Sequence, residues 1–232
     1  AQFVDDSDII SNENFPFATA RQITVAGIDV WAFRISYVGE QGWELYFSFD
    51  GGLKIWDAFF NAGVVPIGVE TYANSRRLEK SLRLQNADLE TDYNLCEADL
   101  ARPLVKKADF HGKPTYITQR LKEQQDCTLC TMIMLDNRDS QGVQRFPVGE
   151  WPILCSTTKQ VLVSQDGRRS VSTSLAYGPS LGVNILMGYL PANRAKVGEE
   201  LLLEYFGDHF PIRVEAVGYQ PLLDPDNLRA RS

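Results

Sequence analysis

The sequence predicts an α+β protein in which a region of mixed strands and helices precedes a small antiparallel sandwich or barrel. Two observations support this class. Apolar residues recur at three- and four-residue spacing in the first half, which is typical of amphipathic helices. After Cys127, short strands separated by turn residues follow one another almost without interruption. At 232 residues, the chain has room for one large domain or two small ones.

The first half alternates strands with helices. Asp50 stands where an N-cap belongs and Gly63 where a helix stops, so the apolar residues between them predict an amphipathic helix. Gly27-Ile28-Asp29 predicts the turn between the first two strands. The predicted strands are 22–30, 31–38 and 43–49, and the predicted helices are 51–62, 69–82 and 113–124.

The second half is predicted to be almost entirely strand. Turn signals at Asp166-Gly167 and Gly207-Asp208 separate short runs of alternating residues, a pattern typical of a small antiparallel sandwich or barrel. The polar stretch 119–126 predicts a domain boundary, which divides the chain into 1–122 and 123–232. The predicted strands are 128–135, 148–153, 160–164, 169–174, 183–190, 199–206 and 210–216.

The charge balance and the absence of long apolar runs exclude several classes. Lys and Arg total 23 against 30 Asp and Glu, and this net charge of −7 disfavours nucleic acid as a partner. A net negative charge is still compatible with a local basic pocket that binds a small polyanion such as polyglutamyl folate. The sequence contains no run of eighteen apolar residues, so no membrane span is predicted. The acidic N-terminus lacks the charged-then-apolar order of a signal peptide. We expect a cytoplasmic protein without membrane contact.

The four cysteines do not predict a metal centre. Cys127-Thr-Leu-Cys130 has CxxC spacing, but it lies in a predicted strand, where residues three apart point to opposite faces. A zinc site would need a second pair of ligands, and the chain offers only His111 and His209. We expect reduced thiols, buried or half-buried, and no metal.

Three blocks carry a resemblance to a known family. They are the G-E-x-G-W-E-L-Y block at 39–46, the segment Asn74-Ser-Arg-Arg-Leu-Glu-Lys-Ser81, and a D-F-x-G-K block at 109–113. Together they resemble the glycine-cleavage T-protein (aminomethyltransferase) family. These blocks are most similar to those in the folate-binding C-terminal half of dimethylglycine and sarcosine dehydrogenases and oxidases. The likeness runs from about Phe15 to Pro225.

This resemblance implies a domain assignment and a function. Residues 1–122 would be a partial folate-binding domain of mixed strands and helices, and residues 123–232 the family's C-terminal domain, a small antiparallel Greek-key β-barrel. The implied chemistry is tetrahydrofolate-dependent transfer of an aminomethyl or methylene unit in glycine, sarcosine or dimethylglycine catabolism. The one-carbon donor would be a small amine or a lipoyl-carried aminomethyl group. FAD is expected only where a dehydrogenase domain lies upstream.

The resemblance also implies that part of the family fold is absent. The aspartate credited with the chemistry lies in a stretch that family members carry before the position of Phe15, so the catalytic residue is unknown and we expect the chain alone to be an incomplete catalyst. The absent stretch would leave apolar surface around Gln22–Tyr37. We expect a homodimer, a partner or a preceding segment to cover it.

The predicted helix 69–82 carries the candidate cofactor-binding residues Glu79, Tyr72 and Arg76. In a regular α-helix Tyr72 and Glu79 share one face, and Arg76 can pair with Glu79 at i, i+3. By themselves, these three residues are as consistent with a solvated helix face carrying an exposed ion pair as with a binding surface. The resemblance implies instead that Glu79 accepts two pterin N–H groups, that Tyr72 lines the same pocket, and that Glu79 faces a ligand rather than a core. We interpret Glu40 and Glu44 as structural, tying turn amides or pairing with Arg34.

Two other functions stay open at this stage. One is a non-catalytic folate-binding or scaffold protein, although the chain lacks the K-G-C-Y-x-G-Q-E signature of the assembly branch. The other is a folate-dependent O- or S-demethylase on the same fold. Asp99 stands where a glycine is common in the family, and His111 replaces an apolar residue.

Overall fold

Contacts along the chain divide it into two units. The computed structural model describes residues 2–101 and 104–231. The first unit comprises residues 2–72 together with 224–231, and the second comprises residues 73–223. The boundary predicted after residue 122 lies within the second unit and stays a prediction.

A three-stranded antiparallel sheet forms the centre of the first unit. Its order is β1 (Ala20–Val25), β2 (Ile28–Phe33) and β3 (Glu44–Tyr46). The β1–β2 turn is Ala26-Gly27, both with positive φ, as a two-residue hairpin turn requires. The turn predicted at Gly27–Asp29 is therefore placed too late, because Ile28 already pairs with Val25.

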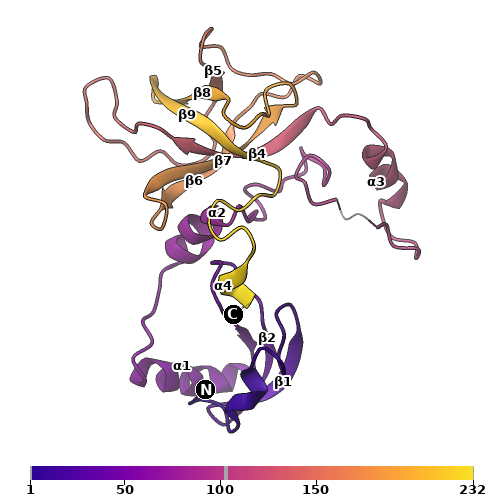
Figure 1. Ribbon diagram of the computed structural model, residues 1–232, viewed down its shortest axis with the longest axis vertical. Helices are drawn as coiled ribbons and strands as arrows, with labels where there is room; N and C mark the ends of the chain where they lie inside the picture. The colour runs from indigo at the N-terminus through magenta and orange to yellow at the C-terminus, as the bar shows by residue number, and fades with distance from the viewer. Residues whose placement is uncertain (1, 102–103, 232) are drawn as a thin grey trace. The chain divides into compact units, whose positions relative to one another are not determined.

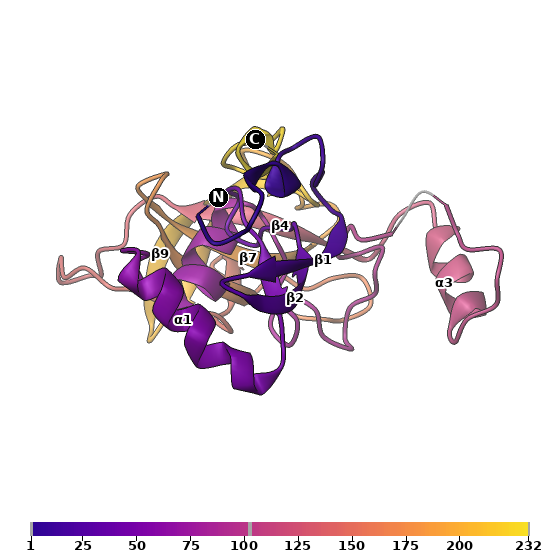
Figure 2. The same cartoon turned by 90° about the horizontal axis from the view of Figure 1, so that it is seen from below.

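Helix α1 (Gly52–Asn61) lies beside the β1–β2 hairpin in both Figure 1 and Figure 2. Ile55 and the inward residues of the sheet form a buried cluster that also contains Phe15. The predicted helix is confirmed, but Asp50 is not its N-cap: it lies in the 3-10 turn η2 (Phe49–Gly51), and Gly51 takes the cap position. The unit also contains the 3-10 turn η1 (Ser7–Ile10) and the short helix α4 (Leu228–Arg231).

The segment 69–82, predicted as a regular α-helix, contains a π-helix. Residues Glu70–Arg76 form a π-helix, η3, and only Arg77–Glu79 form the α-helical turn α2. The face shared by Tyr72 and Glu79 was inferred from 3.6 residues per turn. A π-helical stretch has a different period, so that spacing argument does not apply here.

Six antiparallel strands dominate the second unit, in the order β5-β8-β9-β4-β7-β6 (Figure 1). An isolated bridge between Pro152 and Val171 joins segments next to the two edge strands, so the sheet curls back on itself. The mixed class and the antiparallel arrangement are confirmed. The strands are β4 (Cys127–Met134), β5 (Ile153–Cys155), β6 (Ser172–Gly178), β7 (Val183–Pro191), β8 (Glu200–Tyr205) and β9 (Asp208–Val217).

Two details of the second unit correct the sequence prediction. The stretch 160–164 is no strand of its own; it makes only isolated bridges, at Val161 and Val163. The stretch 148–153 contributes only its last residue to β5. Helix α3 (Lys113–Arg120) begins where predicted, after Gly112 at positive φ, and ends four residues earlier than its predicted end at Gln124.

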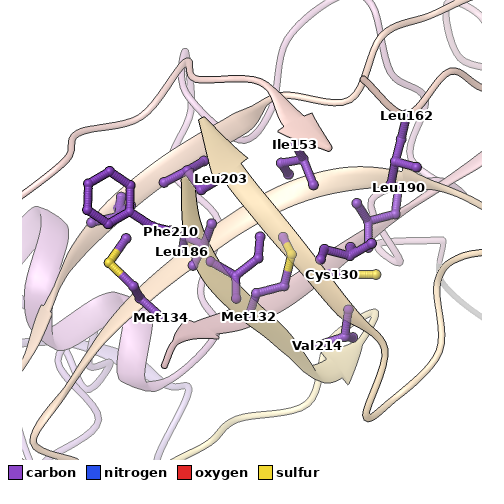
Figure 3. Close-up of a cluster of buried hydrophobic side chains, with 13 residues drawn as sticks. Cys130, Met132, Met134, Ile153, Leu162, Leu186, Leu190, Leu203, Phe210 and Val214 are labelled. Carbon is purple, nitrogen blue, oxygen red and sulfur yellow. The ribbon is translucent and has the colours of Figure 1, made fainter. Parts of the chain in front are cut away.

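The curled sheet encloses a core of aliphatic, methionine and phenylalanine side chains, as Figure 3 shows for Met132, Leu186 and Phe210. Cys130 belongs to this cluster, whereas Cys127 belongs to a second cluster with Leu78 and Tyr189. The two thiols thus lie on opposite sides of β4, as the strand argument predicted. No helix in the described part of the chain has the length and apolar character needed to cross a bilayer.

At Gly188, β7 lies very close to the segments that carry Val171 and Ile153. A Cβ at this position would lie 2.7 Å from the Val171 carbonyl oxygen and 2.8 Å from Ile153 Cδ1. We expect Gly188→Ala to lower the free energy of unfolding by about 1–3 kcal/mol, because the backbone must move. Urea denaturation measures this. Gly68→Ala is the control, since nothing lies within 4 Å there. Equal stability of both variants would contradict the close approach.

Candidate functional site

The carboxylate of Glu79 is held inside the second unit. Its Oε1 accepts hydrogen bonds from the backbone N–H groups of Ser180 (2.6 Å) and Leu181 (3.3 Å). Its Oε2 accepts one from Arg76 Nη1 at 3.0 Å. The side chain is fully buried. Three protein donors therefore satisfy this carboxylate from both sides.

The turn between β6 and β7 is shaped to receive Glu79. Gly178 permits the approach: a Cβ there would lie 3.2 Å from Glu79 Cγ and 2.5 Å from Ile185 Cδ1. Arg76 also donates to the Ser180 hydroxyl, so the cation and the carboxylate hold the same turn. The backbone carbonyl of Glu79 accepts from the N–H groups of Leu222 and Leu223.

The structure therefore gives Glu79 a structural role. Glu79 is buried and bonded to internal donors, and the expectation that it faces a ligand rather than a core stays a prediction. Arg76 and Glu79 do pair at i, i+3 as predicted, with the carboxylate buried instead of solvated. Their predicted contact with a pterin stays a prediction.

Arg77, next to this pair, is fully buried and forms an ion pair with the equally buried Asp88. The guanidinium also donates to the carbonyl oxygens of Ala73 (2.7 Å) and Leu82 (3.0 Å) and to the hydroxyl of Ser174 on β6. Asp88 in turn accepts from the Thr173 hydroxyl. This buried pair ties α2 to the barrel.

Tyr72 belongs to the first unit and contacts a different carboxylate. Its hydroxyl donates to Glu44 Oε1 at 3.2 Å, and Tyr46 donates to Glu44 Oε2 at 2.9 Å. The Tyr37 ring lies 5.4 Å from that of Tyr72, centroid to centroid. Glu44 is half-buried at the surface, so part of its carboxylate remains open to solvent.

This tyrosine cradle, made of Glu44, Tyr37, Tyr46 and Tyr72, lies on the outer face of the three-stranded sheet. Glu44 pairs with Phe33 across the strands, and Tyr46 pairs with Trp31. Because alternate strand residues share a face and paired residues share it too, Glu44 and Tyr46 lie with Phe33 and Trp31 on the face away from the buried core. The Phe33 and Tyr46 rings meet edge to face at 5.1 Å. An aromatic surface with a carboxylate at its centre suits a flat heteroaromatic ligand.

Burial and the Glu44 carboxylate favour the protonated forms of Tyr72 and Tyr46. Burial and the nearby Glu44 carboxylate raise the pKa of Tyr72, and the hydrogen bond to Glu44 raises the pKa of Tyr46. Both hydroxyls therefore act as donors at neutral pH. Each Glu44 oxygen takes one tyrosine hydrogen bond and has a further lone pair for a ligand donor.

Sequence reasoning did not place Glu44 beside Tyr46 and Tyr72. We interpreted it, with Glu40, as structural; its bonds to two tyrosines are not the turn-amide contacts expected. The backbone N–H of Glu40 donates to Ser36 Oγ at 3.1 Å. The available signal was strand alternation: Glu44 and Tyr46 share a face that also carries exposed Trp31.

The two departures from the family pattern lie elsewhere. Asp99 adopts a left-handed conformation with φ 53°, which explains why glycine suits this position, and its carboxylate accepts from the Tyr219 N–H at 2.7 Å. His111 is exposed and lines a cavity of 1030 Å³ in the second unit. None of the predicted site residues lines that cavity.

Three carboxylates gather at the wall of this cavity: Glu97, Asp126 and Asp166, whose oxygens lie within 4.8 Å of one another. Arg168 forms ion pairs with Glu97 and Asp166, and Lys122 forms one with Asp126 at 3.0 Å. Arginine and lysine thus already balance most of this charge, and we assign no metal to it.

Family profiles match the chain over two segments. Residues 1–108 match the GCVT N-terminal domain, and residues 153–218 match the glycine cleavage T-protein C-terminal barrel domain. The chain belongs to the glycine cleavage T-protein family. The resemblance carried by the three sequence blocks is thereby confirmed.

Individual relatives of this T-protein family member fall into two kinds. Mitochondrial dimethylglycine dehydrogenase from Homo sapiens is 30% identical over 211 residues, which cover 88% of this chain and 22% of the enzyme. An aminomethyltransferase from Nostoc sp. is 28% identical over 200 residues, covering 82% of this chain and 46% of that protein. The chain therefore spans about half of the aminomethyltransferase and less of the dehydrogenase.

A solved structure supports the fold. The glycine cleavage system aminomethyltransferase T from Bartonella henselae superposes with a TM-score of 0.72 at 20% identity, covering 90% of this chain and 53% of its own. The predicted fold class, with its C-terminal barrel, is confirmed by this match.

The internal bonds of Glu79 predict a stability effect. We expect Glu79→Gln to lower the free energy of unfolding by about 2 kcal/mol, because the new NH₂ group meets other donors. Urea denaturation with Glu90→Gln as an exposed control measures the difference. If both variants unfold at the same urea concentration, Glu79 does not hold the β6–β7 turn.

Cys155 predicts a pH-dependent reactivity. Donors from the backbone of Thr158, the Thr158 hydroxyl, the backbone of Thr157 and Arg194 lower the pKa of its thiol to about 6. Burial raises the pKa of Cys130 to about 12. Since the thiolate reacts, alkylation of Cys155 should rise with pH to half its plateau rate near pH 6.

Peptide mapping by mass spectrometry after brief iodoacetamide treatment follows each thiol. Arg194→Met removes one donor, so the midpoint of Cys155 alkylation should move to higher pH. Faster labelling of Cys96 than of Cys155 at pH 6.5 would contradict this assignment, because burial raises the pKa of Cys96.

Proposed function

We propose that this protein binds tetrahydrofolate and takes part in folate-dependent one-carbon transfer. Family membership supports this proposal. The observation that carries it is the tyrosine cradle: a surface carboxylate held between two tyrosine hydroxyls on an aromatic sheet face. The relatives named dimethylglycine dehydrogenase and aminomethyltransferase supply the reaction class.

The pterin ring fits the chemistry of this cradle. It presents an N–H and an NH₂ on adjacent ring positions, and a carboxylate can accept both as a two-point contact. Glu44 offers two oxygens at the surface, and Tyr37, Tyr46 and Tyr72 offer aromatic faces and edges beside it. We therefore propose Glu44 as the pterin acceptor and retain Tyr72 as a wall of the pocket.

Glu79 suits this role less well. Its oxygens already accept three internal hydrogen bonds, and its side chain has no exposed surface. Binding a pterin there would require the β6–β7 turn to leave. Glu79 and Arg76 would then serve folate binding by holding the second unit in shape, with no contact to the ring.

The residues of the cradle bind and orient; they do not supply the reacting atoms. Tetrahydrofolate supplies the nucleophilic nitrogen that accepts the one-carbon unit. Glu44 fixes the ring in its plane, and the protonated tyrosines hold Glu44 in one rotamer. Orientation of this kind accounts for a large share of catalysis in bimolecular transfers.

We further propose that the donor is a small secondary or tertiary amine processed by a flavin domain, as in the dimethylglycine dehydrogenase relatives. Two observations support this branch: the resemblance of segment 74–81 to it, and the 30% identity with human dimethylglycine dehydrogenase. FAD belongs to the proposal only through such a domain. A lipoyl-carried aminomethyl donor, the aminomethyltransferase alternative, predicts no flavin.

Calorimetric titration with tetrahydrofolate tests the cradle. We expect Glu44→Gln to weaken binding by about 2–3 kcal/mol, because one acceptor becomes a donor facing donors. Tyr72→Phe should cost less, since the ring remains. Asp29→Asn is the matched control: it lies on the same sheet face, and its carboxylate accepts from Thr24 Oγ1 within the hairpin at 3.0 Å.

The outcomes separate the candidate roles. Loss of affinity in Glu79→Gln, with unchanged stability and unchanged binding by Glu44→Gln, would return the anchor to Glu79. No measurable tetrahydrofolate binding by the folded protein would reject the function. Binding without methylene-tetrahydrofolate formation by the full-length gene product, supplied with dimethylglycine or sarcosine, would favour the non-catalytic folate-binding alternative.

A further inference from the structure

The outer face of the three-stranded sheet continues beyond the tyrosine cradle. Glu44 pairs with Phe33 across β2 and β3. The next pair on the same face is Tyr46 with Trp31. Trp31 and Tyr46 are 49% and 57% exposed, whereas Ala32, on the opposite face, is fully buried in the core of the unit. One face of the sheet therefore packs on the core, and the other presents aromatic side chains to solvent.

Trp31 is placed within reach of a ligand bound at Glu44. Residues on a diagonal across two antiparallel strands lie about 7–8 Å apart, which aromatic side chains can span. Glu44 and Trp31 stand on such a diagonal, because Glu44 lies opposite Phe33 and Trp31 lies two residues before Phe33. Tyr46 lies opposite Trp31 and donates to Glu44 Oε2 at 2.9 Å, so it joins the carboxylate to the indole.

The cradle has other side chains at one end and an open sheet face at the other. Tyr37 follows Phe33 along the chain, and its ring lies 5.4 Å from that of Tyr72. The Tyr72 hydroxyl donates to Glu44, so both rings stand beside the carboxylate. Trp31 precedes Phe33 and therefore stands at the opposite end of the cradle. A ligand anchored at Glu44 has open aromatic surface in the direction of Trp31.

We propose that Trp31 is the platform for the second ring of tetrahydrofolate, the p-aminobenzoyl group. This inference rests on the proposed folate function, with Glu44 as the pterin acceptor. A CH₂–NH bridge joins the pterin to the second ring, and it separates the two rings by a distance of the same order as the diagonal from Glu44 to Trp31. The second ring is flat and largely apolar, and flat rings of this kind stack on exposed aromatic side chains.

The two contacts divide recognition between them. Glu44 binds the pterin N–H groups, which every reduced pterin carries, so it does not distinguish tetrahydrofolate from a shorter pterin. Trp31 contacts a ring that the shorter pterins lack, and it is therefore a specificity-determining residue. Holding one ring on each side of the bridge also fixes the bridge nitrogen, which is one of the two nitrogens that carry the one-carbon unit.

Calorimetric titration of the full chain with two ligands tests the platform. The probes are tetrahydrofolate and 6-methyltetrahydropterin, which has the reduced pterin but no second ring. We expect Trp31→Leu to raise the Kd for tetrahydrofolate about tenfold, because stacking on the second ring is lost. The Kd for 6-methyltetrahydropterin should stay within about twofold, since the contact with Glu44 is unchanged. Trp31→Phe keeps a flat ring and should restore most of the affinity for tetrahydrofolate.

Trp56→Leu is the matched control, because Trp56 is 55% exposed and belongs to helix α1 instead of the sheet. It should change neither affinity. Equal weakening of both ligands by Trp31→Leu, or unchanged binding of tetrahydrofolate, would overturn the platform. Equal affinity of the wild-type protein for both ligands would overturn it too, and would leave the pterin site in place. Binding of neither ligand by the wild-type protein would instead refute the folate function itself.

Discussion

The buried ion pair between Arg77 and Asp88 holds helix α2, which lies within the 74–81 motif, against the barrel. Neither side chain is exposed, and the guanidinium also reaches Ser174 on β6. Removing one partner of such a pair leaves an uncompensated charge and typically costs about 3–5 kcal/mol. Because Arg77 fixes α2 against the barrel, it also sets where Glu79 meets the β6–β7 turn.

Regular periodicity made much of the fold predictable. Helix 51–62 could be predicted because its apolar spacing depends only on nearby residues. The strands after Cys127 could be predicted for the same reason, from alternation and turn residues. The π-helix at Glu70–Arg76 was not predictable, since its sequence also suits an α-helix. The bridges at 161 and 163 replaced a predicted strand because barrel curvature, a tertiary property, limits pairing there.

The candidate site was predictable only in part. Tyr72 was predicted to share a helix face and a pocket with Glu79, seven residues away. In the structure its hydroxyl bonds Glu44, twenty-eight residues away on a strand. The fate of Glu79 depends on Ser180, more than a hundred residues later in the chain. Contacts at such separations leave no periodic trace. A glutamate buried against a distant turn and a glutamate on an aromatic sheet face therefore look alike in sequence.

The second unit is inserted into the first, because residues 224–231 return to the unit that residues 2–72 begin. The two ends of the insertion meet at Glu79, whose carbonyl accepts from Leu222 and Leu223. During synthesis on the ribosome, the whole barrel emerges before the residues that complete the first unit. Residues 224–231 can therefore join the first unit only after the barrel has been made, so the order of synthesis places barrel folding before this last contact.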